Sequence, residues 1–180
     1  GKGVAAALVM VMVRSILHLV ANTDKDASTM LSWINRGITG KIEMDHYATL
    51  GLVDVNLATG EVEYANAGHQ PLLIYRAQED GLESVELKSI PIGVERGMNY
   101  ARKPLKVRAG DVLLLYTDGV VEAMNAENQE FGDNHFHQII QQMGTRDSNQ
   151  MLNLIIKAID EFRKDAPQSD DITVVTLRLL

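Results

Sequence analysis

The sequence predicts an α+β domain, and three observations carry this prediction. Apolar, helix-forming segments stand at the N-terminus and again between about residues 133 and 163, short strand patterns lie between them, and one further apolar strand closes the chain. Helices and antiparallel strands in separate blocks are typical of α+β domains. With 180 residues, 46% of them hydrophobic and 23% charged, the chain is long enough for a sizeable core, and we expect residues 1–180 to form a single domain.

The N-terminal segment predicts two helices. Residues 4–21 are good helix formers and apolar almost all round, so we expect this first helix to be covered on several sides. Lys2 and the apolar run after it resemble a signal peptide, but Arg14 and His18 interrupt the run and no small-x-small cleavage site follows. A second helix is predicted at about 26–36, capped by Asp26 or Ser28.

The middle of the chain predicts an antiparallel meander. Residues alternate between apolar and polar, and turn signals such as Ala58-Thr59-Gly60 and Gln78-Glu79-Asp80-Gly81 separate the alternating segments. The last strand must return to the sheet after two helices. The predicted strands are 47–56, 61–65, 71–75, 84–87, 104–107, 111–116 and 172–178, and the predicted later helices are 133–143 and 148–163.

Acidic residues stand at the ends of two of these strands. The run 112–116 ends in Thr117-Asp118-Gly119, and the run 172–177 follows Asp170-Asp171 directly. If the two strands pair antiparallel, the end of one meets the start of the other, and their carboxylates converge. Such oxygens favour a hard divalent cation, Mg²⁺ or Mn²⁺. Ordinary turn chemistry is the alternative for each motif taken alone.

Neither strand is amphipathic over its length. We therefore expect both to be central strands that are covered on both faces, and the ends of central strands are where sites on rigid scaffolds tend to lie.

Charge and composition exclude several classes of function. Lys plus Arg number 17 against 24 acids, for a net charge of −7, and no dense basic stripe is present, so nucleic acid is a poor candidate partner. The absence of cysteine excludes disulfides and thiolate metal sites. Lys2 lies between two glycines, but the phosphate-binding pattern G-x-x-x-x-G-K-[ST] is absent.

Several short motifs occur in the order found in one protein family. They are G-K-G-V-x-A-A-L at 1–8, Y-A-T-L at 47–50, A-N-A-G-H-x-P at 65–71, P-I-G at 91–93, G-D-V-L-L-L-Y-T-D-G-V at 110–120 and S-D-D-I-T at 169–173. In these residues the chain resembles the bacterial SpoIIE/RsbU-type serine/threonine phosphatases of the PPM (2C-like) superfamily. The resemblance covers essentially the whole chain.

The resemblance implies an α-β-β-α sandwich of two antiparallel sheets flanked by helix pairs, with two Mn²⁺ or Mg²⁺ ions at one edge. Asp118 matches the metal-binding aspartate of the family's T-D-G motif, and Asp170 matches the one that opens D-[DN]-x-T. Asp171 is then a neighbour. The implied reaction is hydrolysis of a phosphoserine or phosphothreonine monoester by metal-bound water, without a covalent intermediate and so without a catalytic side chain.

The family's G-K-G is preceded by G-D-x-S, whose aspartate bridges the two metals, whereas this chain begins at Gly1. By resemblance the domain is N-terminally incomplete, lacking a strand and acidic ligands. We therefore expect the chain as written to bind divalent metal weakly and to have little or no phosphatase activity, even if the intact protein is an enzyme.

Asn66, Gly68 and His69 lie in a polar connection between two strands, where a histidine could act as an acid, a base or a metal ligand. Turn geometry is the favoured role, and we expect these residues, like Gly119, to shape a loop near the site. His135 and His137 are spaced i, i+2 and do not share a helix face, which argues against a metal pair.

The preferred hypothesis is that the chain is a cytoplasmic phosphoprotein phosphatase module, joined in the intact protein to an upstream sensor, receiver or coiled-coil segment. By resemblance its substrate is a phosphorylated anti-anti-sigma (STAS-type) protein in a partner-switching pathway of sigma factor regulation, and part of the first helix pair is a regulatory contact surface. A homodimer is one possible assembly, and we do not expect this domain to insert into a membrane. The alternative is a catalytically inactive interaction domain of the same fold. A different metal-dependent hydrolase ranks lowest.

Overall fold

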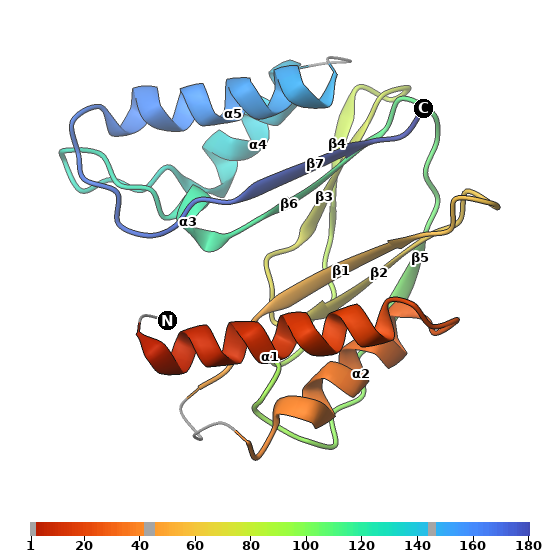
Figure 1. Ribbon diagram of the computed structural model, residues 1–180. Coiled ribbons are helices and arrows are strands. Elements are labelled where there is room, and N and C mark those ends of the chain that lie inside the picture. Colours follow the sequence, from red (N-terminus) through yellow and green to blue (C-terminus); the bar gives the residue numbers. More distant parts are fainter. Residues whose placement is uncertain (1–2, 42–45, 144–146) are drawn as a thin grey trace. The chain divides into compact units, whose positions relative to one another are not determined.

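The chain forms two compact units in the computed structural model, which describes residues 3–41, 46–143 and 147–180 (Figure 1). Unit 1 comprises Gly1–His69 and Leu87–Lys106, and unit 2 comprises Gln70–Glu86 and Val107–Leu180. Each unit contains one antiparallel sheet and its own helices.

Unit 1 is built from a three-stranded sheet in the order β1-β2-β5 and two helices. Strand β2 is central and pairs antiparallel with both neighbours, with Leu52 opposite Ala65 and Ala65 opposite Arg102. Gly60, at φ +74°, lies in the turn that joins β1 to β2. The elements are α1 (Val4–Val20), α2 (Ala27–Ile38), β1 (Leu50–Val55), β2 (Val62–Ala67) and β5 (Arg102–Leu105).

Helix α2 supplies most of the core of unit 1. Leu31, Ile34 and Ile38 recur at helical spacing and are fully buried, in one cluster with Ala65 of β2. The side chain of Asp26 accepts a hydrogen bond from the Thr29 amide at 2.8 Å, so Asp26 is the N-cap, one of the two residues proposed from the sequence. The helix is thus anchored at its N-terminus and held along one face.

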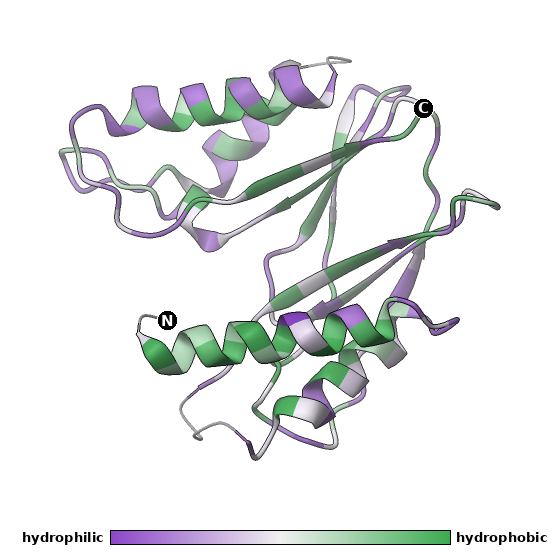
Figure 2. Cartoon of the chain, in the orientation of Figure 1, coloured by the Kyte–Doolittle hydropathy of each residue, from purple (hydrophilic) through white to green (hydrophobic). Residues whose placement is uncertain are grey.

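Helix α1 spans the predicted residues but is less covered than predicted. It packs on α2, where Gly37 lies against the side chain of Ile16, and only Val9 and Val20 are buried. The helix is apolar along much of its length (Figure 2). The expectation of burial on several sides was wrong, because an all-round apolar sequence does not by itself supply neighbours. Large apolar side chains that remain exposed on α1 are Val4, Leu8, Met10, Val11 and Leu19.

Unit 2 is built from a four-stranded antiparallel sheet in the order β4-β3-β6-β7 with three helices. Its core joins one face of the sheet to α4 and α5, and the rings of Tyr116 and Phe136 meet edge to face with centroids 4.9 Å apart. The elements are β3 (Leu72–Arg76), β4 (Gly81–Val85), β6 (Val112–Tyr116), α3 (Asp118–Val121), α4 (Gly132–Met143), α5 (Ser148–Arg163) and β7 (Val174–Arg178).

Strand β6 is central and covered as predicted, but β7 is not. Strand β7 is the last strand in its sheet, and burial alternates along it, with Val175 53% exposed and Leu177 40% exposed. The prediction of a central β7 was therefore wrong. A continuous apolar run does not distinguish a strand with two neighbours from an edge strand. In β7 the face toward α5 carries Val174 and Thr176, whereas the apolar Val175 and Leu177 lie on the exposed face.

The predicted fold class, α+β with two antiparallel sheets flanked by helix pairs, is confirmed. The sequence-based prediction missed α3 and placed the ends of several strands incorrectly. The run at 47–49 is not part of β1, because only Ala48 pairs there, in an isolated bridge with Ile92. Strand β4 begins at Gly81, inside the predicted turn. Along the part of the chain that the structure describes, no helix is both long enough and apolar enough to span a membrane.

Candidate metal-binding site at the ends of β6 and β7

Strands β6 and β7 bring two acidic segments to the same end of the sheet of unit 2. They pair antiparallel, with Tyr116 opposite Val174, so the last residue of β6 faces the first residue of β7. Thr117 continues the ladder by donating its amide to the Thr173 carbonyl oxygen at 3.1 Å. The pairing predicted from the two apolar runs is therefore observed, and it places Asp118 beside the segment that contains Asp170.

The side chain of Thr117 fixes the two segments to each other. Its hydroxyl donates to the carbonyl oxygen of Asp171 at 3.2 Å and accepts the amide proton of Thr173 at 3.0 Å. One hydroxyl thus satisfies two backbone groups on the opposite segment. Sequence reasoning assigned no role to Thr117, although a hydroxyl residue at the end of a strand is a common side-chain partner for backbone groups.

Gly119 allows the backbones to approach closely. A Cβ atom at this position would lie 2.4 Å from the carbonyl oxygen of Asp171 and 3.0 Å from its carbonyl carbon. Only a residue without a side chain fits there, and Gly119 is buried. A role for this glycine in shaping the loop beside the site remains a prediction.

The carboxylates of Asp118, Asp170 and Asp171 at this strand end are exposed. Asp118 accepts the amide of Gly119 at 3.0 Å, and Asp170 accepts the amide of Asp171 at 2.8 Å, each through Oδ1; the described part of the chain offers these two side chains no other hydrogen bond. Within the described ranges 3–41, 46–143 and 147–180, no Lys, Arg or His forms an ion pair with any of these aspartates. One oxygen of Asp118 and one of Asp170 therefore remain available for a ligand.

The donor set fits a hard divalent cation but is incomplete in the described residues. Mg²⁺ and Mn²⁺ prefer anionic and neutral oxygen ligands, and protein sites often contribute only one or two carboxylates beside water and phosphate. Asp118 and Asp170 match this chemistry. Among the residues that the structure describes, however, no group of three or more His, Asp or Glu side chains is arranged to hold a metal ion.

Asn66, Gly68 and His69 form a turn in unit 1 whose hydrogen bonds are structural. The Asn66 carboxamide is buried, accepts the His69 amide at 2.7 Å and donates to the His69 carbonyl oxygen at 2.9 Å. Gly68 has φ +69°, and a Cβ there would lie 2.9 Å from the Pro91 nitrogen. The imidazole Nδ1 of His69 lies 3.3 Å from the Thr49 hydroxyl.

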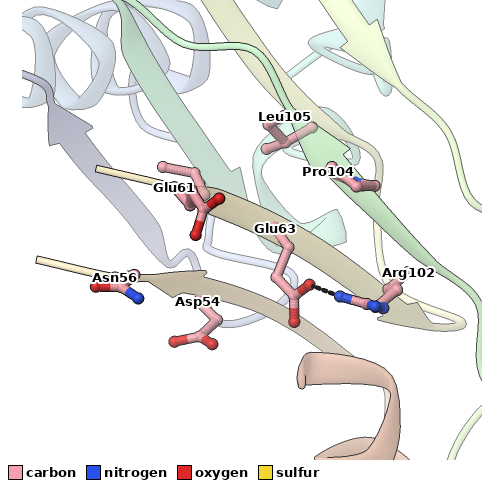
Figure 3. A pocket seen from close by; sticks show the side chains of 8 residues that line it. Asp54, Asn56, Glu61, Glu63, Arg102, Pro104 and Leu105 are labelled. Carbon is pink, nitrogen blue, oxygen red and sulfur yellow. Dashed lines mark hydrogen bonds and ion pairs between the residues drawn. The ribbon is translucent and has the colours of Figure 1, made fainter. Parts of the chain in front are cut away.

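An open cavity of about 310 Å³ lies in unit 1 at the end of β1, β2 and β5 (Figure 3). Glu63 is ion-paired there with Arg102 and also accepts the Ala27 amide at the start of α2. Neither Asp118 nor Asp170 lines this cavity, so it is no part of the candidate metal site. Its lining residues are Asp54, Asn56, Glu61, Val62, Glu63, Arg102, Pro104 and Leu105.

Two antiparallel sheets with flanking helices are also the fold of solved PP2C domains. The SiaA-PP2C domain of Pseudomonas aeruginosa superposes with a TM-score of 0.84 at 19% identity, covering 99% of this chain and 71% of that one. The PP2C phosphatase domain of SpoIIE from Bacillus subtilis, solved with a fragment of its regulatory domain, gives a TM-score of 0.83 at 22% identity, covering 99% and 52%. At these identities the likeness establishes the fold.

The chain belongs to the family described as Stage II sporulation protein E (SpoIIE), whose model matches residues 1–180. It is 25% identical over 178 residues to the phosphoserine phosphatase RsbU of Bacillus subtilis, across 99% of this chain and 52% of that protein. It is 23% identical over 164 residues to the Bacillus subtilis stage II sporulation protein E, across 91% and 19%. The chain thus spans about half of RsbU and a smaller part of the sporulation protein.

Proposed function

We propose that the chain is the phosphatase module of a signalling protein and hydrolyses phosphoserine or phosphothreonine monoesters in a protein substrate, with two Mn²⁺ or Mg²⁺ ions. One observation carries the proposal: Asp118 and Asp170, the aspartates of the two most specific motifs, lie on segments joined at the end of β6 and β7. Relatives named as phosphoserine phosphatases support the reaction class.

Asp118 and Asp170 would hold the cations, and Asp171 would remain a neighbour. When bound, the ions would lower the pKa of a coordinated water and neutralise charge that develops on the phosphoryl oxygens. The chain's own contribution is positional. Thr117 and Gly119 hold the two acidic segments together through backbone contacts, so the carboxylates start from fixed main-chain positions. Their exposure leaves room for a phosphorylated residue on the surface of another protein.

We further propose that the substrate is a phosphorylated STAS-type protein in a partner-switching pathway of sigma factor regulation. The domain would act in the cytoplasm, joined to an upstream sensor or receiver domain in the intact chain. The names of relatives favour this context: one neighbour contains the RsbU and RsbW domains of a single Mycobacterium tuberculosis protein, and the chain spans 49% of that structure. The absence of a basic stripe is in keeping with a protein substrate rather than a nucleic acid.

One observation favours the alternative, a non-enzymatic interaction domain of the same fold. The described residues gather no group of three potential metal ligands, whereas a two-metal site needs several. In that case the domain transmits a signal by binding another protein, and Asp118 and Asp170 take no part in catalysis.

The deciding experiment is Mn²⁺-dependent hydrolysis of a phosphoserine peptide. It compares the 180-residue chain, a form extended upstream of Gly1 that supplies the G-D-x-S segment, and the extended form with Asp118→Asn. We expect activity only in the unsubstituted extended form. Tight binding of two Mn²⁺ ions by the 180-residue chain would contradict the expectation of an incomplete site. A folded extended form that binds its partner but never releases phosphate would favour the interaction domain.

A further inference from the structure

Asn35 of α2 is a polar side chain at the centre of unit 1. It is 0% exposed, and a buried carboxamide must satisfy two donor protons and an acceptor oxygen. Its Nδ2 donates to the carbonyl oxygen of Glu95 at 2.7 Å and lies 3.4 Å from that of Arg96. Its Oδ1 accepts the Gly93 amide at 2.9 Å. All three partners lie in the segment that connects β4 to β5.

The orientation of the Asn35 carboxamide is determined by its partners. The Gly93 amide can only donate, and the Glu95 carbonyl can only accept, so exchanging the nitrogen and oxygen of Asn35 would oppose like groups. One half of the side chain therefore holds residue 93, and the other half holds residues 95 and 96. A further contact, from the Thr39 hydroxyl to Oδ1 at 3.0 Å, stays within the helix end.

The segment held by Asn35 leads directly to two motifs that the metal site does not use. Ile92 exchanges two backbone hydrogen bonds with Ala48, at 2.8 and 3.0 Å, which ties P-I-G to Y-A-T-L. Pro91 lies against Gly68, where no Cβ fits, which ties P-I-G to the turn that holds His69. Three stretches that are far apart in the sequence therefore meet beside one helix.

We propose that Asn35 is a positioning residue, which couples α2 to segment 91–96 and, through Pro91 and Ile92, to the turn that presents His69. Segment 91–96 contains no helix. Backbone bonds to Ala48 and the Tyr100 hydroxyl hold its start at Pro91 and Ile92, and Asn35, with three hydrogen bonds, holds residues 93, 95 and 96. Displacement of α2 would be transmitted to the turn at His69. That this coupling regulates phosphatase activity rests on the proposed function, whereas the coupling itself does not.

Amide hydrogen exchange of the 180-residue chain, without metal or substrate, tests the coupling. Asn35→Ala removes all three bonds to the segment and should accelerate exchange at Gly93, Met98, Ile92 and His69 by about tenfold or more, the factor for loss of one typical buried hydrogen bond. Met98 reports on the other half of the contact, because its amide donates to the Glu95 carbonyl oxygen.

Asn35→Asp separates the two halves of the side chain and serves if the alanine variant does not fold. It keeps the acceptor for Gly93 but loses the donor to Glu95, so Met98 should exchange faster while Gly93 stays protected. Ser32→Ala is the matched control, because Ser32 is buried on the same helix and its hydroxyl donates to the Ser28 carbonyl oxygen within that helix. This control should leave all four reporter amides unchanged.

Two outcomes would overturn the proposal: acceleration of exchange spread equally over β2 and the rest of unit 1, or acceleration that stops at residue 93 and never reaches Ile92 and His69.

If the proposed function holds, Asn35→Asp should also lower kcat/KM for the phosphoserine peptide in the extended form, whereas Ser32→Ala should not. The coupled exchange pattern without any phosphatase activity would retain Asn35 as a positioning residue and reject the enzyme. If Asn35→Asp leaves kcat/KM unchanged, the coupling positions segment 91–96 but does not regulate phosphatase activity.

Discussion

Gly119 stands directly against the carbonyl oxygen of Asp171, so closely that a methyl group in place of its hydrogen would lie 2.4 Å from that oxygen. The contact joins the first turn after β6 to the residue pair that precedes β7. Because it is made by main-chain atoms, it sets the spacing of the two acidic segments independently of their side chains.

Gly119→Ala should therefore disturb the strand end. The added Cβ must push the Asp171 backbone away, and such overpacking in a buried position typically costs about 1–3 kcal/mol of the free energy of unfolding. Urea denaturation measures the loss, and electron paramagnetic resonance of Mn²⁺ measures any change in metal affinity. Gly97→Ala is the control, because a Cβ there meets nothing within 4 Å. Equal stability of the two variants would show that the backbone at Asp171 yields freely.

Asp118→Asn and Asp170→Asn should weaken Mn²⁺ binding in whichever form of the protein binds it, while Asp171→Asn should not. Each proposed ligand accepts the amide of the next residue, and an asparagine oxygen can accept the same bond, so the free energy of unfolding should change by less than about 0.5 kcal/mol. Mn²⁺ titration of the three variants is the measurement. A larger loss of affinity in Asp171→Asn would reverse the assignment of ligand and neighbour.

Asp111 should be the acid-sensitive group of unit 2. It is 1% exposed and accepts hydrogen bonds from Arg76 at 2.8 Å and from the amides of Ala77 and Arg108, both at 3.1 Å. Burial alone would raise the pKa of Asp111, but these hydrogen bonds and the Arg76 charge outweigh it and lower the pKa below its ordinary 3.8. The group therefore stabilises the fold at pH above about 4, and this stabilisation is lost as the pH falls through the lowered pKa.

Asp111→Ala removes one of the two carboxylates that pair with Arg76, while Glu83 remains, and should cost about 1.5–3 kcal/mol of the free energy of unfolding near neutral pH. The gap in unfolding free energy between the wild-type chain and this variant should narrow as the pH is lowered below 4. Urea titrations at several pH values measure it. A gap that does not change between pH 7 and pH 2 would mean that ionised Asp111 adds nothing to the fold.

Asp26→Ala should cost about 1 kcal/mol, because it removes the N-cap of α2. Hydrogen bonding to the Thr29 amide is the largest influence on the pKa of Asp26 and lowers it, so this stabilisation too is present above about pH 4 and fades in acid. Thermal unfolding of Asp26→Ala beside Asp24→Ala, an exposed acid two residues earlier, provides the comparison. Equal melting temperatures would exclude a capping role.

The sequence predicted the elements that carry strong periodicity and missed those decided by tertiary neighbours. Helix α2 and the pairing of β6 with β7 follow from apolar spacing and from where each run ends. The edge position of β7 does not, because it depends on which strand lies beyond it. The four-residue helix α3 is too short to produce a periodic pattern, so Asp118 and Gly119 were singled out as motif residues without the helix that contains them.

The same distinction holds for the candidate site. Asp118 and Asp170 could be named because motifs surround them, whereas Thr117 acts through backbone groups of a segment more than fifty residues away. Asn35 was not singled out from the sequence, because the partners of a single polar residue on an apolar helix face are known only from the structure. A polar residue among the core positions of a predicted helix is the pattern that could have drawn attention to it.

The link between Thr117 and Thr173 also has a consequence for folding. The segment between them contains α4 and α5, so the two acidic ends come together only after a long loop has closed, and such closures are entropically costly and slow. A cation held by Asp118 and Asp170 would fasten this loop at its base and so oppose detachment of the C-terminal strand. Metal would then lengthen the lifetime of the folded chain as well as serve its chemistry, and chelation would first be visible as fraying of β7.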